Sequence, residues 1–139
     1  MYQDLSGLLA LYTHLHDNVL PKTNDALMYL WTAILHDPNH HIFVAIFDDR
    51  IVSSCVFLLV PNLTHGQRPY ALIENVVTHS DYRKRGYATQ VLSYAKALAV
   101  QQNCYKIMLM TGAKDSDIHR FYERAGYNSS DKTAFIQWL

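Results

Sequence analysis

Apolar residues recur at helical spacing in two stretches at the start of the chain. One stretch runs from Leu5 to Leu15, and the other runs from Leu27 to Leu35 after the capping candidates Thr23 and Asn24. Side chains three and four residues apart lie on one helix face, so this pattern predicts two amphipathic helices. The polar residues 14–22 between them predict a loop that could face a substrate.

From residue 41 onward the spacing becomes that of strands. Residues 42–47 and 51–60 flank a short polar turn, which predicts an antiparallel hairpin. A third predicted strand, residues 70–78, carries one carboxylate, Glu74, among apolar neighbours. The later predicted elements are a helix that begins at Gly86, a strand over 105–110, a helix over 116–125 with Gly126 at its C′ position, and a strand over 133–139. This order predicts one α/β domain over residues 1–139 with a mixed sheet.

Composition and charge narrow the classes of function. The 139 residues are 50% hydrophobic and 17% charged, which supplies enough apolar material for a core. Twelve Lys and Arg balance twelve Asp and Glu, so no overall charge favours nucleic acid or an anionic membrane. We expect a cytoplasmic protein, because no apolar run approaches the roughly 18 residues of a membrane span and no secretory signal is recognised. Cys55 and Cys104 lack CxxC spacing and are expected to be buried, reduced thiols.

Three cations stand directly before the predicted helix that begins at Gly86. Arg83, Lys84 and Arg85 precede the glycine, and the small Ala88 follows in the first turn. Exposed cations cost roughly 0.3–1 kcal/mol each at this positive end of a helix dipole, so stability alone does not explain them. Together with uncovered first-turn amides they would suit a multiply charged anion such as pyrophosphate. A solvated charge run and a nucleic-acid patch are the alternatives, and the single cluster with zero net charge counts against the second.

Two short motifs lie on either side of the strand over 105–110. The first, within residues 74–88, reads Arg83-x-x-Gly86-x-Ala88, and the second, within 119–127, is a helix end that reads Phe-Tyr-x-x-x-Gly-Tyr. In this order and at this separation they resemble the acetyl-CoA signature and the second motif of the GNAT superfamily of N-acetyltransferases. The order of elements is similar to that family from residue 4 to residue 139. The resemblance implies a mostly antiparallel central sheet flanked by helices.

The resemblance also implies a V-shaped cleft between two central strands, one ending at Thr78 and one beginning at Tyr105. The pantetheine arm of acetyl-CoA, the cosubstrate, would lie in this cleft. The residues implied to contact the coenzyme are Val76, Val77 and Thr78 through their backbones, and Arg83, Lys84, Arg85, Gly86, Tyr87, Ala88 and Thr89 around the pyrophosphate.

Two residues are candidates for catalysis. Tyr122 takes the position of the family's general acid, which would donate a proton to the departing CoA thiolate. A phenol with an ordinary pKa near 10 is protonated at pH 7, as this role requires. Glu74 is the candidate base, because a carboxylate between apolar residues could be partly desolvated and therefore more basic. Each has a structural alternative: Tyr122 could merely pack beside Phe121, and Glu74 could face solvent or pair with Arg68.

Three features depart from the family's pattern. Residues 1–4 are too few for the strand that usually precedes the first helix. Asp115, counted among the coenzyme contacts, stands where many members have Asn, and a carboxylate can accept but not donate a hydrogen bond. The chain after Gly126 is short, so a partner subunit in a homodimer could supply part of the acceptor-site wall.

We therefore predict an N-acetyltransferase that moves the acetyl group of acetyl-CoA to a primary amine of a small molecule, by direct attack in a ternary complex. The loop 14–22, with Asp17 and the nearby Tyr12, is expected to form one wall of the acceptor site, and an acid there would favour a cationic amine. No metal is predicted, because no HExxH motif occurs. Two alternatives stay open: an enzyme that acetylates peptides or proteins, and a non-catalytic acetyl-CoA sensor.

Overall fold

The computed structural model describes residues 1–15 and 18–139 and confirms the predicted mixed α/β fold. The predicted wall residue Asp17 lies outside the described residues. Among the described residues, none of the helices combines the length and the apolar character needed to cross a bilayer. The helices are α1 (Leu5–Tyr12), α2 (Asp25–His36), α3 (Tyr87–Gln101) and α4 (Ser116–Arg124), and the strands are β1 (His40–Phe47), β2 (Arg50–Val60), β3 (Tyr70–Thr78) and β4 (Ile107–Leu109).

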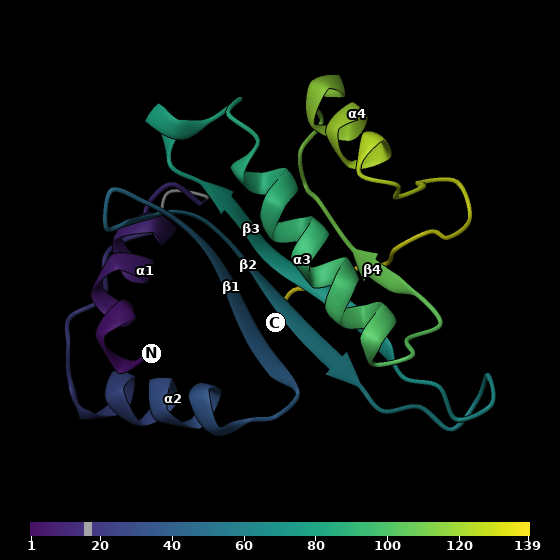
Figure 1. Ribbon diagram of the computed structural model, residues 1–139, viewed down its shortest axis with the longest axis horizontal. Coiled ribbons are helices and arrows are strands. Elements are labelled where there is room, and N and C mark those ends of the chain that lie inside the picture. The colour runs from purple at the N-terminus through teal and green to yellow at the C-terminus, as the bar shows by residue number, and fades with distance from the viewer. Residues whose placement is uncertain (16–17) are drawn as a thin grey trace.

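The four strands form one sheet in the order β1-β2-β3-β4 (Figure 1). The first three are antiparallel neighbours, whereas β4 joins β3 in parallel over only three pairs. Asp48 and Asp49 both have positive φ, 47° and 58°, as the type I′ turn of a tight hairpin requires. The predicted hairpin and the predicted third strand are therefore confirmed, with a sheet that is mostly antiparallel.

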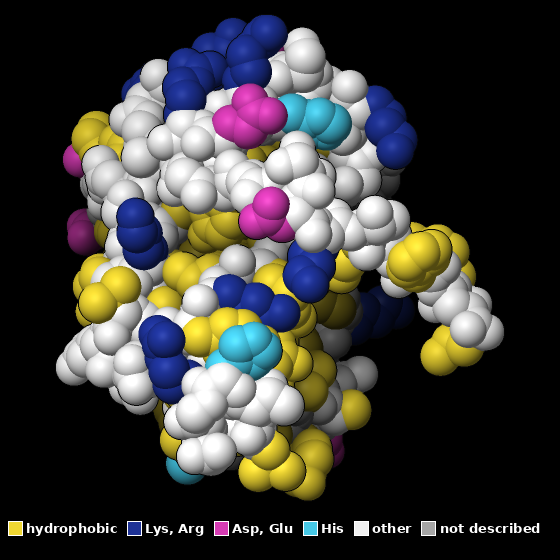
Figure 2. Space-filling view, turned by 90° about the vertical axis from the view of Figure 1, so that its right-hand side faces the viewer, with side chains coloured by type: hydrophobic (Ala, Val, Ile, Leu, Met, Phe, Trp, Pro, Cys, Tyr) yellow, Lys and Arg dark blue, Asp and Glu magenta, His cyan; other side chains and the backbone are white. Residues whose placement is uncertain are grey.

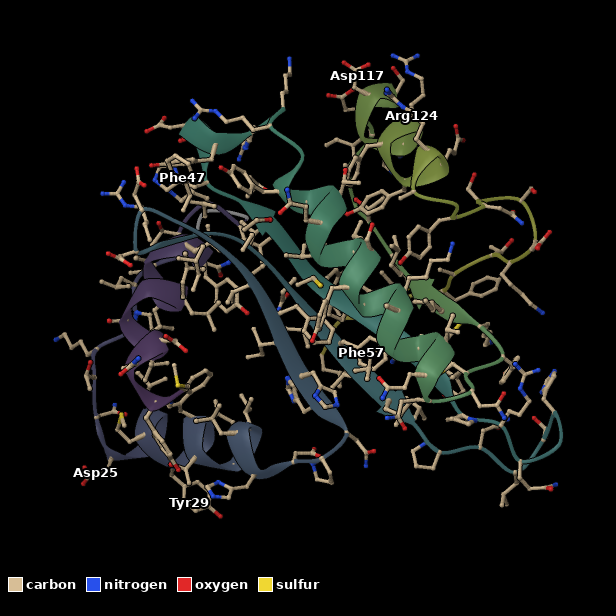
Figure 3. The ribbon with its side chains drawn as sticks, viewed as in Figure 1. Asp25, Tyr29, Phe47, Phe57, Asp117 and Arg124 are labelled. Atoms are coloured by element: carbon tan, nitrogen blue, oxygen red, sulfur yellow. The ribbon has the colours of Figure 1, made fainter. Side chains whose placement is uncertain are left out.

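Helices cover both faces of the sheet and enclose two cores. α3 packs on one face, where Phe57, Ile73 and Leu92 are buried, and Figure 3 shows Phe57 beside α3. α1 and α2 pack on the other face, where Leu11 and Trp31 are buried. Alternate residues of β1 pack against the first and the second core, because successive strand side chains point to opposite faces.

The predicted strand over 133–139 is wrong. These residues pair with no strand within the described part of the chain, and in Figure 2 they stand out from the body as an arm. Alternating apolar residues favour a strand, but a strand also needs a neighbour whose backbone completes its hydrogen bonds. As a result β4 is an edge strand rather than a central one, and the predicted strand over 105–110 is shortened to three residues.

Candidate active site

A bulge in β3 opens the sheet beside β4. Between the pairs Val56–Glu74 and Ser54–Val77, β3 has one residue more than β2. Asn75, within this bulge, has a φ of 50°, a left-handed conformation that Asn adopts more readily than most residues. A bulge bends its strand and increases the local twist. β3 therefore continues away from the segment that follows β4, after only three parallel pairs.

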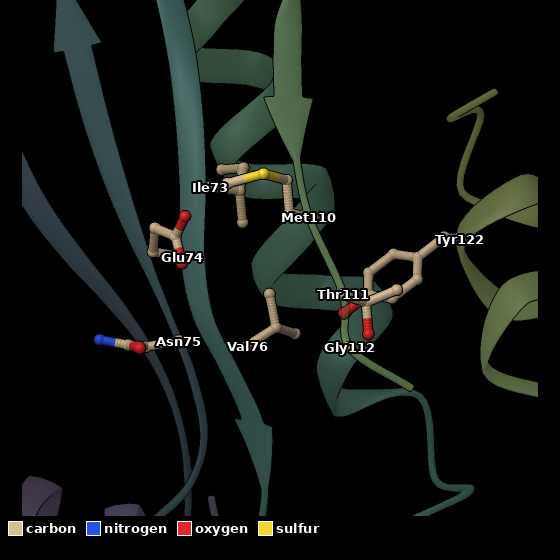
Figure 4. A pocket seen from close by; sticks show the side chains of 8 residues that line it. All are labelled: Ile73, Glu74, Asn75, Val76, Met110, Thr111, Gly112 and Tyr122. Atoms are coloured by element: carbon tan, nitrogen blue, oxygen red, sulfur yellow. The ribbon is translucent and has the colours of Figure 1, made fainter. Parts of the chain in front are cut away.

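The gap between these two segments is the predicted cleft. It holds a cavity of about 100 Å³. Figure 4 shows Glu74 and Tyr122 on opposite sides of the gap, with Val76 pointing into it. The two predicted catalytic residues thus line one cavity. The complete lining is Ile73, Glu74, Asn75, Val76, Met110, Thr111, Gly112 and Tyr122, of which Met110, Thr111 and Gly112 carried no signal in the sequence.

Replacing Asn75 by Val is expected to destabilise the fold. A left-handed backbone costs an ordinary L-residue roughly 1–2 kcal/mol, and Val has no short polar side chain to offset that cost. Asn75→Gly is the matched control, because Gly adopts positive φ without strain and should change the free energy of unfolding by less than about 1 kcal/mol. Urea denaturation of both variants measures the difference. Equal losses in the two variants would show that the backbone conformation of residue 75 is not the cause.

The end of α4 fixes the position of Tyr122. Gly126 has a φ of 94°, its N–H donates to the Glu123 carbonyl at 2.9 Å, and the Tyr127 N–H donates to the Tyr122 carbonyl at 3.0 Å. These two bonds form a Schellman motif, as the predicted C′ glycine requires. The Tyr122 and Tyr127 rings meet edge to face with centroids 6.2 Å apart.

Burial raises the pKa of the Tyr122 phenol above its ordinary value of 10.0. Desolvation is the main cause, and Cys55 adds a smaller effect in the same direction. A raised pKa favours the neutral form, so the phenol is protonated at neutral pH. A general acid must hold its proton in this way before the reaction.

Glu74 lies on the face of β3 opposite to the one that packs against α3. Its neighbour Ile73 is buried in the first core, so strand alternation places Glu74 on the face shared with α1 and α2. The alternative pairing with Arg68 is not formed. The Arg68 guanidinium group donates instead to the carbonyls of Asn103 at 3.1 Å and Cys104 at 3.0 Å. Glu74 is half-buried at the cavity.

The start of α3 lies near the end of β3 and presents uncapped backbone donors (Figure 1). Gly86 is the N-cap with a φ of 86°, and no described side chain accepts from the first turn. A Cβ at Gly86 would meet none of the described atoms within 4 Å, so the space before the helix is open. Lys84 also has a positive φ, 60°, and left-handed residues in such a loop let successive amides converge on one anion. This geometry fits a pyrophosphate group.

The three cations of this loop are exposed, and two of them are engaged with neighbours. The Arg83 Nε donates to the Thr78 carbonyl at 3.3 Å, which ties the loop to the end of β3. Arg85 lies over the Tyr82 ring, 5.2 Å from its centroid. Lys and Arg side chains gather at this end of the molecule in Figure 2. The other implied coenzyme contacts, residues 87–89, form the first turn of α3.

Among the β3 residues implied to hold the pantetheine arm, Val76 lines the cavity. Val77 is buried in the second core, and its carbonyl accepts a hydrogen bond from Ser53 Oγ at 2.9 Å. The Thr78 hydroxyl also bonds to Ser53 Oγ at 2.9 Å, and its carbonyl accepts from Arg83. Successive strand carbonyls point to opposite sides, so the Val76 carbonyl is directed toward the cleft.

Asp115 is the N-cap of α4. Its carboxylate accepts a hydrogen bond from the Asp117 N–H at 2.7 Å, which satisfies one of the free donors of the first turn. This capping bond gives the acid at position 115 a structural role. Its contact with the coenzyme stays a prediction.

Cys55 is the buried thiol that the sequence predicted. It is fully buried, and burial raises the pKa of its thiol to about 12. The thiolate, which is the nucleophilic form, is therefore scarce at neutral pH. This protonation state favours direct transfer over a covalent intermediate on Cys55.

Comparison with known proteins gives concordant matches. A model of the acetyltransferase (GNAT) family matches residues 8–127. A putative acetyltransferase from Agrobacterium tumefaciens, whose structure is solved, is 41% identical in sequence and superposes with a TM-score of 0.93. The match covers 100% of this chain and 96% of that protein. An aminoalkylphosphonate N-acetyltransferase from Salmonella typhimurium is 29% identical over 92% of this chain and 81% of that enzyme. A glucosamine 6-phosphate N-acetyltransferase from Trypanosoma brucei brucei is 29% identical over 60% of this chain, which spans only 54% of that enzyme.

The sheet that splits beside β4, with a cleft next to the uncapped start of α3, fits a protein that binds a coenzyme through its pyrophosphate group. The chain belongs to the GNAT family of acetyltransferases, since the family model covers most of its length. It is accordingly an enzyme, and its cosubstrate is acetyl-CoA. The family resemblance of the two motifs is confirmed.

Proposed function

We propose that the protein transfers the acetyl group of acetyl-CoA to a primary amine of a small molecule within a ternary complex. The observation that carries the proposal is that Glu74 and Tyr122 line one cavity, at the gap beside the Asn75 bulge. The coenzyme would lie on the side of α3, with its pyrophosphate at Gly86. The amine would approach from the face that carries Glu74.

The two catalytic groups would act on opposite sides of the transferred acetyl group. The Glu74 carboxylate takes a proton from the ammonium form of the acceptor, directly or through a water molecule. The amine nitrogen then attacks the acetyl carbonyl carbon, so that a C–N bond forms while the C–S bond breaks. The Tyr122 hydroxyl gives its proton to the leaving thiolate, and the nitrogen of the new amide gives up its second proton, which restores the Tyr122 hydroxyl through water. The products are an amide, a thiol and the proton held by Glu74, which passes to solvent. Burial, which raises the pKa of Tyr122, keeps this proton available at neutral pH.

A small amine that also carries an anionic group is the acceptor class that we place first. The names of the two curated relatives give an aminoalkylphosphonate and glucosamine 6-phosphate, each of which combines an amine with a phosphorus oxyanion. We also propose a cytoplasmic location, which is supported by the free thiols of Cys55 and Cys104.

A thiol-release assay tests this function. Acetyl-CoA is offered with aminoalkylphosphonates, hexosamine phosphates, uncharged amines and short peptides, and mass spectrometry identifies the acetylated product. We expect turnover with small primary amines and little with peptides. Turnover with peptides alone would assign the enzyme to protein acetylation, and binding of acetyl-CoA without any transfer would indicate a sensor.

Acetyl-CoA is expected to stabilise the folded protein, by about 2.7 kcal/mol at one hundred times its dissociation constant. Gly86→Asp should abolish this stabilisation, because it places a negative charge beside the pyrophosphate and strains a position whose φ is 86°. Gly86→Ala is the control, since it adds the same backbone strain without the charge. Thermal unfolding with and without acetyl-CoA measures the stabilisation in both variants. A wild-type protein that is free of coenzyme and shows no change in Tm would contradict the proposed pyrophosphate site.

A further inference from the structure

We propose that His119 is a positioning residue, which holds one wall of the cavity in place relative to the Tyr122 hydroxyl. This wall is part of the segment that follows β4, residues 110–115, here called the wall segment. His119 acts on the wall segment through one hydrogen bond to the Ala113 carbonyl. The inference rests on the proposed function, because it takes the Tyr122 hydroxyl as the acid.

The wall segment joins β4 to α4 without belonging to either element. β4 ends at Leu109, and α4 begins at Ser116. Met110, Thr111 and Gly112 line the cavity (Figure 4). None of the described strands pairs with this segment, so the hydrogen bonds of the sheet do not fix it. Other contacts therefore determine where it lies.

Both backbone polar groups of Ala113 are hydrogen-bonded. Its N–H donates to Thr111 Oγ1 at 3.2 Å, and its carbonyl accepts from His119 Nε2 at 2.7 Å. The first bond is local to the wall segment, whereas the second joins this segment to α4. Because a carbonyl oxygen only accepts, Nε2 carries a proton, and both the neutral Nε2–H tautomer and the imidazolium can form the bond. The wall segment is thus attached to α4 through the His119 ring.

α4 carries His119 and Tyr122 on the same side. The two are three residues apart, a spacing that makes side chains neighbours on a helix surface. The His119 N–H donates to the Asp115 carbonyl at 3.2 Å, so His119 is fixed in the regular hydrogen bonding of α4. One helix therefore holds the Tyr122 hydroxyl and, through the His119 ring, the wall segment.

The packing of α4 gives this bond its importance. None of the α4 side chains is fully buried, and Phe121 and Tyr122 pack only partly against the first core. His119 itself is exposed and does not line the cavity. It is therefore placed to act through its neighbours rather than on the substrates. Without its bond, the wall segment and Tyr122 would move independently.

Replacing His119 by Leu is expected to lower kcat by roughly 10–10²-fold, because a displacement of about 1 Å can cost about 10²-fold in rate. His119→Gln should keep most of the activity, since the Gln amide can still donate near the position of Nε2. His36→Leu is the matched control. His36 is also an exposed histidine whose ring donates to a backbone carbonyl at 2.7 Å, that of Thr32, but it does not line the cavity. Its loss should leave kcat unchanged.

A double-mutant cycle separates positioning from stability. His119→Leu is combined with Tyr122→Phe, and kcat is measured on a verified acceptor for the wild type, both single variants and the double variant. Once the Tyr122 hydroxyl is absent, His119→Leu should cost less than about threefold, because the effects of residues that act as a unit are not additive. Equal losses in the two backgrounds, or wild-type kcat in His119→Leu alone, would overturn the proposal. Wild-type kcat in Tyr122→Phe would instead refute the proposed acid, and the proposal with it.

Hydrogen exchange tests the bond without any acceptor. In the coenzyme-free protein, the backbone amides of the wall segment should exchange faster in His119→Leu than in the wild type and in His119→Gln, because local opening becomes easier. Amides of β2 should exchange at the same rate in all three proteins, which would show that the fold is intact. Unchanged exchange of the wall segment in His119→Leu would show that His119 does not hold it, and would overturn the proposal.

Discussion

Tyr122→Phe is expected to lower kcat by roughly 10²–10⁴-fold, the range typical of losing a general acid or base. The substitution keeps the ring, which packs partly against the first core, and removes only the hydroxyl that would protonate the leaving thiolate. Acetyl-CoA should therefore still bind and still raise the Tm. Steady-state kinetics on a verified acceptor, combined with thermal unfolding, separates the loss of chemistry from a loss of binding.

Tyr127→Phe is the matched control for this experiment. Tyr127 is also a partly buried tyrosine, and burial raises its pKa to about 12, but it does not line the cavity. Loss of the Tyr127 hydroxyl should change the stability of the fold more than it changes turnover. Wild-type turnover in Tyr122→Phe would rule out the phenol as the acid and assign that role to water.

Glu74→Gln should alter the pH dependence of kcat/KM. Gln keeps the size and shape of the side chain but cannot accept the proton of the ammonium substrate. The loss of rate should therefore be largest near neutral pH, of the order of the 10²–10⁴-fold typical of a general base, and should diminish at high pH. The recovery follows because the free amine becomes abundant and needs no base. The measurement is the full pH profile under conditions where chemistry limits the rate.

Glu123→Gln is the control for the loss of a carboxylate, because Glu123 is exposed on α4 next to Tyr122 in sequence and does not line the cavity. It should leave the profile unchanged. If Glu74 has only a structural role, its replacement by Gln would also leave the shape of the pH profile unchanged and would alter only stability. An unchanged profile in Glu74→Gln would therefore refute the assigned base and direct attention to a water network or to His79.

The parts of the fold that local residues determine could be predicted from the sequence. Asn24 caps α2 by accepting from the Leu27 N–H at 2.9 Å, and Gly126 ends α4 in the left-handed conformation, as both residue types favour. The two aspartates of the hairpin turn determine its geometry for the same reason. At these positions the residue type favours the same backbone conformation that the helix end or the turn requires.

Features that depend on distant neighbours were not predictable in this way. The β3 bulge at Asn75 becomes visible only when β3 is paired with β2, although an Asn within a run of strand residues is a weak signal of positive φ. Residues 110–112 line the cavity because they follow the end of β4. Their own sequence does not encode where that strand ends. The error at residues 133–139 has the same origin, because strand propensity says nothing about whether a neighbouring strand is present.

Direct transfer in a ternary complex differs from transfer through an acetylated enzyme in the order of its steps, and a single-turnover experiment distinguishes the two. The protein, in excess over acetyl-CoA, is quenched at intervals with and without a verified amine, and the free thiol, the acetylated amine and the mass of the protein are measured. We predict no thiol release and no acetylated protein without the amine, and one thiol per acetylated amine when it is present. Thiol released before the amine is added, together with a protein heavier by one acetyl group, would contradict direct attack in a ternary complex.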